Sequence, residues 1–510
     1  MKFIEGKNRT QIPLFVDSLD SSIDSDNEIR LVDLFVDSLD LEGFGFKMAF
    51  IENGRPAYHP KDLLKLFLYG YLNRVRSSRQ LEKECKRNIE LMWLMKGLVP
   101  DHNTISNFRK DNSKSIRKVF HATVSLAKNF DLIGGKLVAG DGTKLRAQNS
   151  KKNNFTHSKI ERHIAYIDDK LIEYNNILTH EDKDLTQEQK TEIEKKISKH
   201  ELHKDKYEGF QKQLAETGEV QVSTSDPESR QMIIRNNVTE VAYNIQSTVD
   251  AEYNIPIDFK VTNKNDAKAM GAMVRRAKTI LGHSEFTAIF DKGYHTGSEF
   301  DYAHKHEVEV IVAVPAVASH APDIAFDVEH FRYNKELDQY TCPANELLTT
   351  NGNSYNKGSG NSNKVKHYKT KACKSCSLSK KCTRNKAGRI LERSQHMELI
   401  EANKKRYAEN SEIYRKRQAI VEHPFGIIKR QWDFYYIMTK KSMKHASADV
   451  GLIFTCYNLR RIFNLIDQNE LKKYLKELGF NFWVLRSCFK RFYGTFINQF
   501  TLVRILQTQN

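Results

Sequence analysis

Residues 137–147 read LVAGDGTKLRA, a short apolar segment that runs into Asp141 and an immediate glycine. This pattern predicts a buried strand that ends at Asp141 and turns at Gly142. A second segment, EFTAIFD at 285–291, predicts another strand that ends in an aspartate, Asp291. Aspartates at strand ends either cap turns or form part of a site at the edge of a sheet.

Further strands and helices are predicted around these two segments. Residues 242–251 (AYNIQSTVDA) and 255–262 (IPIDFKVT) predict a hairpin, and residues 266–281 predict a helix. VEVIVAVPA at 308–316 is apolar enough for a strand in the middle of a sheet. From about residue 395 the pattern is helical. The expected fold class is therefore α/β, with a mixed sheet and flanking helices.

Length and charge limit the class of protein. A chain of 510 residues is too long for one simple core, so two to four domains are expected. Lysine and arginine outnumber aspartate and glutamate by 81 to 64, which gives a net charge of +17. Such a surplus favours a polyanionic partner, because each neutralised phosphate releases condensed counterions. A basic protein with no nucleic-acid role is the alternative reading of charge alone.

Three sequence features indicate an intracellular protein. The first residues, MKFIEGKNRT, lack the apolar region of a signal peptide. No apolar run approaches the ~18 residues of a membrane helix. Seven cysteines in so long a chain do not make a secreted disulfide scaffold. We therefore expect a soluble protein that is not embedded in a membrane.

Residues 55–115 predict a compact helical region, in which Pro60 stands where a helix would begin. A basic group accompanies it, made of Arg74, Arg76, Arg79, Lys83, Lys86 and Arg87. This combination suits a helix-turn-helix-like DNA reader, with a solvated polar face as the alternative. The heptapeptide LFVDSLD also occurs twice, at 14–20 and 34–40, which is a short duplication and not a solenoid.

Residues 155–218 predict a helical hairpin inserted after the first strand. One helix carries apolar residues at heptad spacing, and Thr186 with Gln189 can cap the second. The heptad positions are Ile160, Ile164, Ile167, Leu171, Tyr174 and Leu178. Two helices joined by a polar turn are expected to pack against each other.

Four cysteines follow the pattern C-x30-C-x2-C-x5-C, namely Cys342, Cys373, Cys376 and Cys382. Four thiolates can hold a tetrahedral zinc ion, and a C-x2-C pair binds one ion easily. The spacing therefore predicts a structural zinc site. Ordinary buried thiols, a redox-active pair and a degenerate site are the alternatives.

A later helix carries Glu422, which completes a set of three carboxylates with Asp141 and Asp291. Carboxylates are hard oxygen ligands that suit magnesium or manganese. Three that converge can hold two ions about 3.5–4 Å apart, as phosphodiester cleavage requires. Asp250 and Asp266 compete for the second position. Asp250 ends a strand of the predicted hairpin, and Asp266 is expected only to cap the following helix.

The segments GDGTKLRA (140–147), IFDKGYHTG (289–297) and RQAIVEHPFGIIKRQW (417–432) closely resemble the three catalytic motifs of bacterial DDE insertion-sequence transposases, in the same order. Residues 59–94 and PDHNTISNFRK (100–110) are similar to the InsH-type N-terminal domain of these enzymes. With FTCYNLRRI (454–462), the resemblance covers roughly residues 30–465.

The resemblance implies a ribonuclease-H-like catalytic domain with Asp141, Asp291 and Glu422 at the DDE positions. The domains expected are a helical DNA-binding domain at 1–125 and a catalytic domain at 130–465. Inserts at 155–218 (helical) and 325–395 (Cys-rich) interrupt the catalytic domain, and 466–510 is a C-terminal extension of unknown role. Two Mg²⁺ or Mn²⁺ ions are the implied cofactors, with Zn²⁺ possible at the cysteines.

In related transposases, an arginine and a lysine flank the glutamate and contact the DNA backbone. Lys429 matches the lysine. The broad pattern places the arginine where this chain has Gln418, whereas Arg417 fits the RQxIVE form of this subgroup. The full set of expected DNA-binding residues is Arg417, Lys429, Arg430, Arg76 and Arg79. Pro424 implies either a kinked helix or a new helix that starts there.

The implied function is cleavage at the ends of an insertion sequence and strand transfer into target DNA. The expected partners are double-stranded DNA, as terminal inverted repeats and target, and a second copy of the chain in a synaptic homodimer. A cytoplasmic, nucleoid-associated bacterial protein is expected. A catalytically inactive DNA-binding descendant and a metal-dependent nuclease without strand transfer are the alternatives.

Overall fold

The computed structural model describes residues 18–48, 56–180, 186–235, 238–316, 321–356, 364–439 and 441–480. The chain forms two compact units. The first comprises Met1–Phe130, Lys144–Tyr243 and Ile428–Asn510, and the second comprises Asp131–Thr143 and Asn244–Ile427. The first LFVDSLD copy lies mostly outside the described residues, and the second forms part of a helix.

The first unit is largely helical, and Pro60 is the first residue of one helix, as predicted. A long C-terminal helix, α14, packs against α2, α5 and α6. Residues 468–480 are also helical, and the rest of the C-terminal segment lies outside the described residues. The helices are α1 (Ile29–Asp37), α2 (Pro60–Leu72), α3 (Ser78–Cys85), α4 (Ile89–Leu94), α5 (His102–Asp111), α6 (Ser113–Asn129) and α14 (Met443–Leu465).

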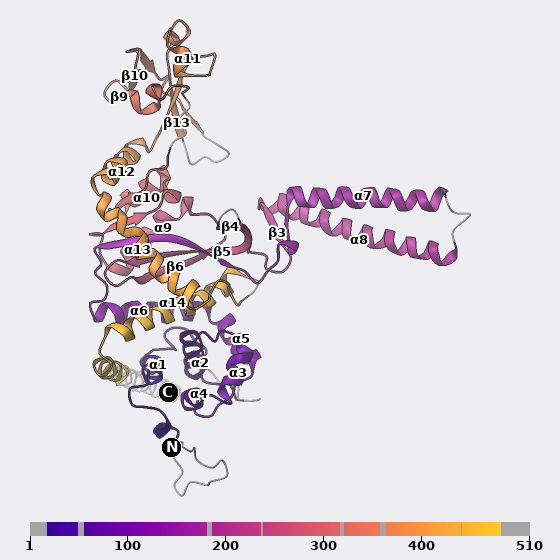
Figure 1. Ribbon diagram of the computed structural model, residues 1–510, viewed down its shortest axis with the longest axis vertical. Coiled ribbons are helices and arrows are strands. Elements are labelled where there is room, and N and C mark those ends of the chain that lie inside the picture. The colour runs from indigo at the N-terminus through magenta and orange to yellow at the C-terminus, as the bar shows by residue number, and fades with distance from the viewer. Residues whose placement is uncertain are drawn as a thin grey trace, which may run out of the picture. The chain divides into compact units, whose positions relative to one another are not determined.

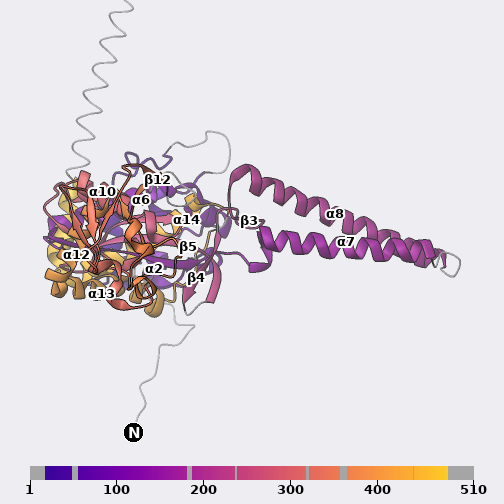
Figure 2. The same ribbon diagram turned by 90° about the horizontal axis from the view of Figure 1, so that it is seen from above.

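A helical pair also belongs to the first unit: α7 (His157–His180) and α8 (Gln187–Thr217) run side by side (Figures 1 and 2). Thr186 and Gln189 form the predicted capping box at the start of α8. At the base, the short strands β2 (Asn154–Thr156) and β3 (Gln221–Ser223) pair. An apolar cluster of Phe155, Ile160, Leu214 and Val222 lies there.

The second unit is built on a mixed sheet with strand order β6-β5-β1-β7-β8. β5 and β6 form the predicted antiparallel hairpin, whereas β1, β7 and β8 are parallel. In the first unit, β4 (Arg230–Arg235) pairs with the start of β5. The strands are β1 (Leu137–Arg146), β5 (Val238–Asp250), β6 (Ile255–Thr262), β7 (Thr287–Phe290) and β8 (Glu309–Val312).

Strand β1 does not end at Asp141, as the sequence predicted, but continues to Arg146. The expected turn is absent because Gly142 lies within the strand itself. Because Gly142 has no side chain, another residue can lie close to the strand at this position. A Cβ built on Gly142 would lie 2.4 Å from Oδ1 of Asp266.

Four helices cover this sheet: α9 (Met270–Leu281), α10 (Gly297–Lys305), α12 (Met397–Glu409) and α13 (Ser411–Gly426). α9 packs on β6, α12 on β8 and α13 on β7. Ile420 and Val421 of α13 join Ala139, Val249, Ile289 and Ile311 in one apolar core cluster. This packing fixes α13 beside the strands that lead to Asp141 and Asp291.

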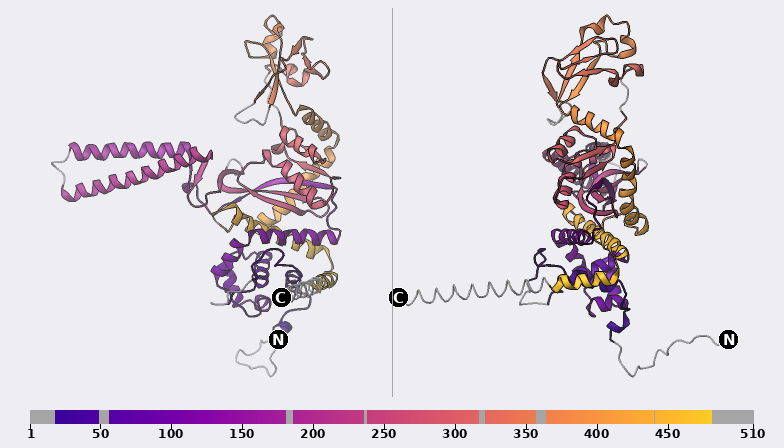
Figure 3. Two further views of the ribbon diagram at one scale, coloured as in Figure 1. Left: turned by 180° about the vertical axis from the view of Figure 1, so that it is seen from behind. Right: turned by 90° about the vertical axis from the view of Figure 1, so that its left-hand side faces the viewer.

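A second, antiparallel sheet occupies the part of the second unit that was predicted as a Cys-rich insert (Figure 3). Its core cluster comprises Phe331, Tyr340, Leu348, Tyr368 and Leu391. Its strands are β9 (Arg332–Asn334), β10 (Gln339–Thr341), β11 (Leu347–Thr349), β12 (Ser354–Asn356), β13 (Lys364–Lys369) and β14 (Ile390–Ser394). Within the described ranges, no helix combines the length and apolar character needed to cross a membrane.

Candidate active site

The register of two parallel strands brings Asp141 and Asp291 to the same level of the sheet. β1 pairs with β7 so that Leu137 lies opposite Thr287 and Ala139 opposite Ile289. Asp141 and Asp291 each come two residues after the paired residues Ala139 and Ile289, and Asp291 directly follows β7. The two carboxylates predicted from strand ends therefore lie on neighbouring strands.

The Asp141 carboxylate is largely buried among charges. Its Oδ1 accepts a hydrogen bond from the Gly142 backbone N–H at 2.7 Å. Its Oδ2 lies 3.3 Å from the Arg417 guanidinium. Burial raises the pKa of Asp141 to about 6, helped by the charges of Asp291 and Asp266 and opposed by Arg417. Asp291 and Asp266 thus lie close enough to Asp141 for their charges to act on it.

Asp266 is not the cap residue that the sequence predicted. The short helix η3 (Asp266–Lys268) has Asn265 at its cap position, and α9 has Ala269. Oδ1 of Asp266 accepts hydrogen bonds from Asn244 Nδ2 at 2.7 Å and Gln246 Nε2 at 2.6 Å. This carboxylate is directed toward β1 and β5. The sequence pattern alone could not predict that position.

Asp250 has the structural role that its strand-end position suggests. Its carboxylate accepts hydrogen bonds from the backbone N–H groups of Gly134, Gly135 and Glu252, at 2.9 to 3.1 Å. These bonds hold two turns together. Asp250 is fully buried.

Tyr294 connects the Asp291 loop to Asp266. Its hydroxyl donates a hydrogen bond to Gln246 Oε1, and Gln246 Nε2 donates to Asp266. Tyr294 is fully buried, so burial and the charges of Asp266, Asp141 and Asp291 raise its pKa well above the ordinary value. It therefore stays a neutral hydrogen-bond donor beside the carboxylates.

Glu422 lies on α13, which also contains Pro424, so no new helix starts at the proline. The break comes after Gly426, where a π-helical turn, η8 (Ile427–Gln431), follows. The Glu422 side chain is exposed and accepts a hydrogen bond from Gln418 Nε2 at 2.9 Å. Its neighbour Val421 is the residue that packs into the core.

The donor types at this site fit a divalent cation. Asp141, Asp291 and Asp266 offer hard carboxylate oxygens, and the charges of Asp291 and Asp266 help to raise the pKa of Asp141. Oδ1 of Asn244 is a buried oxygen without a hydrogen-bond partner among the described residues. However, within the described ranges no three Asp, Glu, His or Cys side chains are already arranged to hold an ion.

The expected DNA-binding residues are placed differently from one another. Arg79 on α3 and Arg430 in η8 are exposed, and Lys429 is half-buried. Arg417 faces Asp141. The structure contradicts the expected DNA-binding role of Arg76. Only 6% of this residue is exposed, and it forms an ion pair with Asp449 at 2.6 Å.

Asp449 is the centre of a buried network within the first unit. Its carboxylate accepts hydrogen bonds from the Tyr71 hydroxyl and from Arg76, and it lies 3.5 Å from Arg109. Burial acts to raise the pKa of Asp449, but the two arginines outweigh it and lower the value. Arg76 therefore ties α14 to the N-terminal helices.

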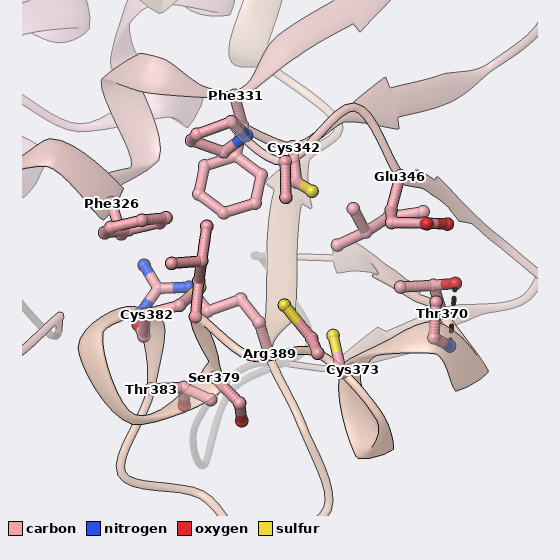
Figure 4. A pocket seen from close by; sticks show the side chains of 16 residues that line it. Phe326, Phe331, Cys342, Glu346, Thr370, Cys373, Ser379, Cys382, Thr383 and Arg389 are labelled. Atoms are coloured by element: carbon pink, nitrogen blue, oxygen red, sulfur yellow. Dashed lines mark hydrogen bonds between the residues drawn. The ribbon is translucent and has the colours of Figure 1, made fainter.

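The four cysteines line one cavity of about 30 Å³ (Figure 4). Cys342 follows β10, Cys373 lies in η7 (Lys371–Lys374), and Cys382 ends α11 (Ser379–Cys382). Burial raises the pKa of Cys382, and the other three thiols add to this effect. Strands β11, β12 and β13 lie between Cys342 and Cys373 in the chain, and among the described residues the four thiols are not arranged as a metal-binding group.

Two transposase families match parts of this chain. The family described as "Transposase domain (DUF772)" matches residues 17–111, which include α1 to α5. The "Transposase DDE domain" family matches residues 341–463, which include the four cysteines and Glu422. Asp141 and Asp291 lie outside both matched ranges.

No curated protein matches the chain. Among solved structures, a cryo-EM structure of a piggyBac transposase synaptic complex with hairpin DNA is similar at 9% sequence identity and a TM-score of 0.30. The similarity covers 89% of this chain and 77% of that chain. A TM-score this low supports no statement about the present fold.

Proposed function

We propose that Asp141, Asp291 and Glu422 are the catalytic residues of this chain, a DDE transposase of the insertion-sequence type that cleaves DNA and transfers strands. The observation that carries this proposal is the shared level of Asp141 and Asp291 on parallel strands. The helix of Glu422 packs on the same strands through Ile420 and Val421. The proposal therefore combines two aspartates from neighbouring strands with a glutamate from the helix that packs on those strands.

The three carboxylates would hold two Mg²⁺ or Mn²⁺ ions. Ions bound there would activate the attacking oxygen and stabilise the leaving oxygen of the phosphodiester. Backbone hydrogen bonds orient two of these carboxylates: the Gly142 N–H donates to Asp141, and the Gly293 N–H donates to Asp291. Gln418 orients Glu422 on α13. Arg417 supplies positive charge beside Asp141, where a scissile phosphate would need it.

The catalytic fold proposed for the second unit is ribonuclease-H-like. Its mixed sheet has an antiparallel hairpin, β5–β6, and three parallel strands, β1, β7 and β8. We place the domain boundaries at 1–125 for DNA binding and 130–465 for catalysis, with inserts at 155–218 and 325–395. The role of 466–510 is left unassigned.

The DNA that this enzyme cuts is proposed to be the terminal inverted repeats of its own element, which it joins to target DNA. Arg79, Lys429 and Arg430 are proposed to contact phosphates, because lysine and arginine contacts to the backbone dominate DNA affinity. Two copies of the chain would hold the two ends of the element in a synaptic homodimer. Its DNA substrate would place it at the nucleoid.

Zinc is proposed to bind Cys342, Cys373, Cys376 and Cys382. The supporting observation is that all four line one small cavity whose strands and turns come from residues far apart in sequence. Gly388 also requires glycine, since its φ is +99° and a Cβ would lie 2.6 Å from that of Cys373. The site would tie the ends of the second sheet together.

A joining assay tests strand transfer directly. Wild-type protein, Mg²⁺ or Mn²⁺ and a pre-cut terminal DNA with a free 3′-hydroxyl should give covalent joining to a plasmid. Cutting without joining would favour a simple nuclease. An inert protein that still retards terminal DNA in a gel would favour the non-catalytic descendant.

A further inference from the structure

Three polar atoms converge above the backbone of Gly142, directly after Asp141. A Cβ placed there would lie 2.4 Å from Oδ1 of Asp266, 2.9 Å from Oδ1 of Asn244 and 2.9 Å from Nε2 of Gln246. Any side chain at position 142 would therefore displace this group. The glycine lets Asp266 approach the strand that carries Asp141.

Asp266 is held in that position by neutral amides. Asn244 Nδ2 and Gln246 Nε2 both donate to its Oδ1, and Tyr294 donates to Gln246 from the loop that follows Asp291. Asn244 and Gln246 are almost completely buried on β5. The network thus fixes a carboxylate between the elements of the two catalytic aspartates.

An independent observation indicates a ligand at this position. Oδ1 of Asn244 is buried and has no hydrogen-bond partner in the portion of the chain described by the structure. A buried oxygen left without a donor destabilises the fold, because it has lost its hydrogen bonds to water. A cation bound there would satisfy this oxygen, because amide carbonyl oxygens are ligands for hard divalent ions.

We propose that Asp266 is a fourth acidic residue of the catalytic centre, which binds a divalent cation together with Asp141, with Oδ1 of Asn244 as a neutral ligand. This inference rests on the proposed function. Asp250 provides the contrast, since its carboxylate is occupied by three backbone N–H groups. Oδ1 of Asp266 instead accepts hydrogen bonds from two side-chain amides of β5, Asn244 Nδ2 and Gln246 Nε2.

The test is Mn²⁺ binding by full-length Asp266→Asn, measured by titration calorimetry without DNA. The amide keeps an oxygen that can accept from Asn244 and Gln246, so the substitution removes mainly the charge. We expect Mn²⁺ affinity to fall at least tenfold, whereas the matched variant Asp250→Asn should bind Mn²⁺ like wild type. Circular dichroism and thermal unfolding verify that each variant is folded.

The outcomes separate this proposal from the proposed function. If Asp291→Asn loses Mn²⁺ binding but Asp266→Asn retains it, the role of Asp266 is overturned and the DDE assignment stands. If Asp141→Asn and Asp291→Asn also bind normally, the proposed function itself fails. Should Asp266→Asn not fold, the exchanged pair Asp266→Asn with Asn244→Asp carries the test. It should bind Mn²⁺ within tenfold of wild type, and a folded exchange that binds none would overturn the proposal.

Discussion

Replacing Asp141 by asparagine should stabilise the metal-free protein at neutral pH, although it removes a proposed catalytic residue. Burial and the charges of Asp291 and Asp266 raise the pKa of Asp141 to about 6 from the usual 3.8, despite the nearby Arg417. Folding therefore favours the neutral form of this group. Its contribution to stability is fully present below pH ~4 and is lost as the pH rises through about 6.

The magnitude follows from the shift in pKa. A difference of roughly two pH units corresponds to about 3 kcal/mol at 1.36 kcal/mol per unit. The attraction of Arg417 is already part of the raised pKa and needs no separate correction. Because asparagine is not identical to a protonated aspartate, we expect Asp141→Asn to gain about 1–3 kcal/mol above pH 7 and almost nothing at pH 4.

Denaturant unfolding of both proteins between pH 4 and 8 in EDTA measures this difference. It should grow between pH 4 and 6 and then remain constant, while Mn²⁺ should stabilise wild type more than Asp141→Asn. Asp449→Asn is the control with the opposite sign, because Arg76 and Arg109 lower the pKa of that buried carboxylate and folding therefore favours its charged form. An Asp141→Asn protein that is no more stable than wild type at pH 8 would refute the reasoning.

Three further outcomes are expected. Purified protein should contain about one zinc per chain, which Cys373→Ser with Cys376→Ser should lose; freshly prepared, reduced protein without zinc would disprove the site. Ile164→Asp with Leu171→Asp should make α7 and α8 more sensitive to limited proteolysis in the full chain, because each charge enters an apolar seam; unchanged cleavage would contradict the packing. Asp449→Asn should cost about 3–5 kcal/mol of unfolding free energy because two buried arginines lose their charged partner, and a loss below about 1 kcal/mol would contradict the buried network.

Local patterns predicted the elements that carry the site. The apolar segments before Asp141 and Asp291 are β1 and β7, and the predicted hairpin that lies between them in the chain is β5–β6. Alternation and apolar runs reveal such strands because burial on a sheet requires them. The same patterns placed Gly142 in a turn, because the close approach of Asp266 from a distant segment leaves no local signal.

The role of Arg76 was hidden for the same reason. A run of basic residues predicts a charged surface, but the partner of Arg76 is Asp449, which is 373 positions away in the sequence. One signal was available. Asp449 is the only acidic residue of α14, a helix of 23 residues, and the residues around it are apolar. A lone carboxylate in such a helix indicates a buried cationic partner.

For Asp266, the local sequence and the tertiary contacts lead to different predictions. Its polar turn predicts a helix cap, since asparagine and aspartate favour that position. In the structure its carboxylate receives two amides from β5, a strand that begins 28 residues earlier. The position of the Asp266 carboxylate depends on the direction of the β5 side chains that donate to it. The composition of the turn does not encode that direction.

The most direct test of the account compares Asp141→Asn, Asp291→Asn and Glu422→Gln on terminal DNA in Mg²⁺ or Mn²⁺. Each should abolish cleavage and strand transfer, because the amide keeps the size of the side chain but removes the charge that binds the ions. Each should still retard terminal DNA in a gel, since phosphate contacts from lysine and arginine remain. Asp250→Asn should keep cleavage within about tenfold, roughly 1.4 kcal/mol of barrier. An Asp291→Asn protein that cuts at the wild-type rate would contradict the catalytic assignment.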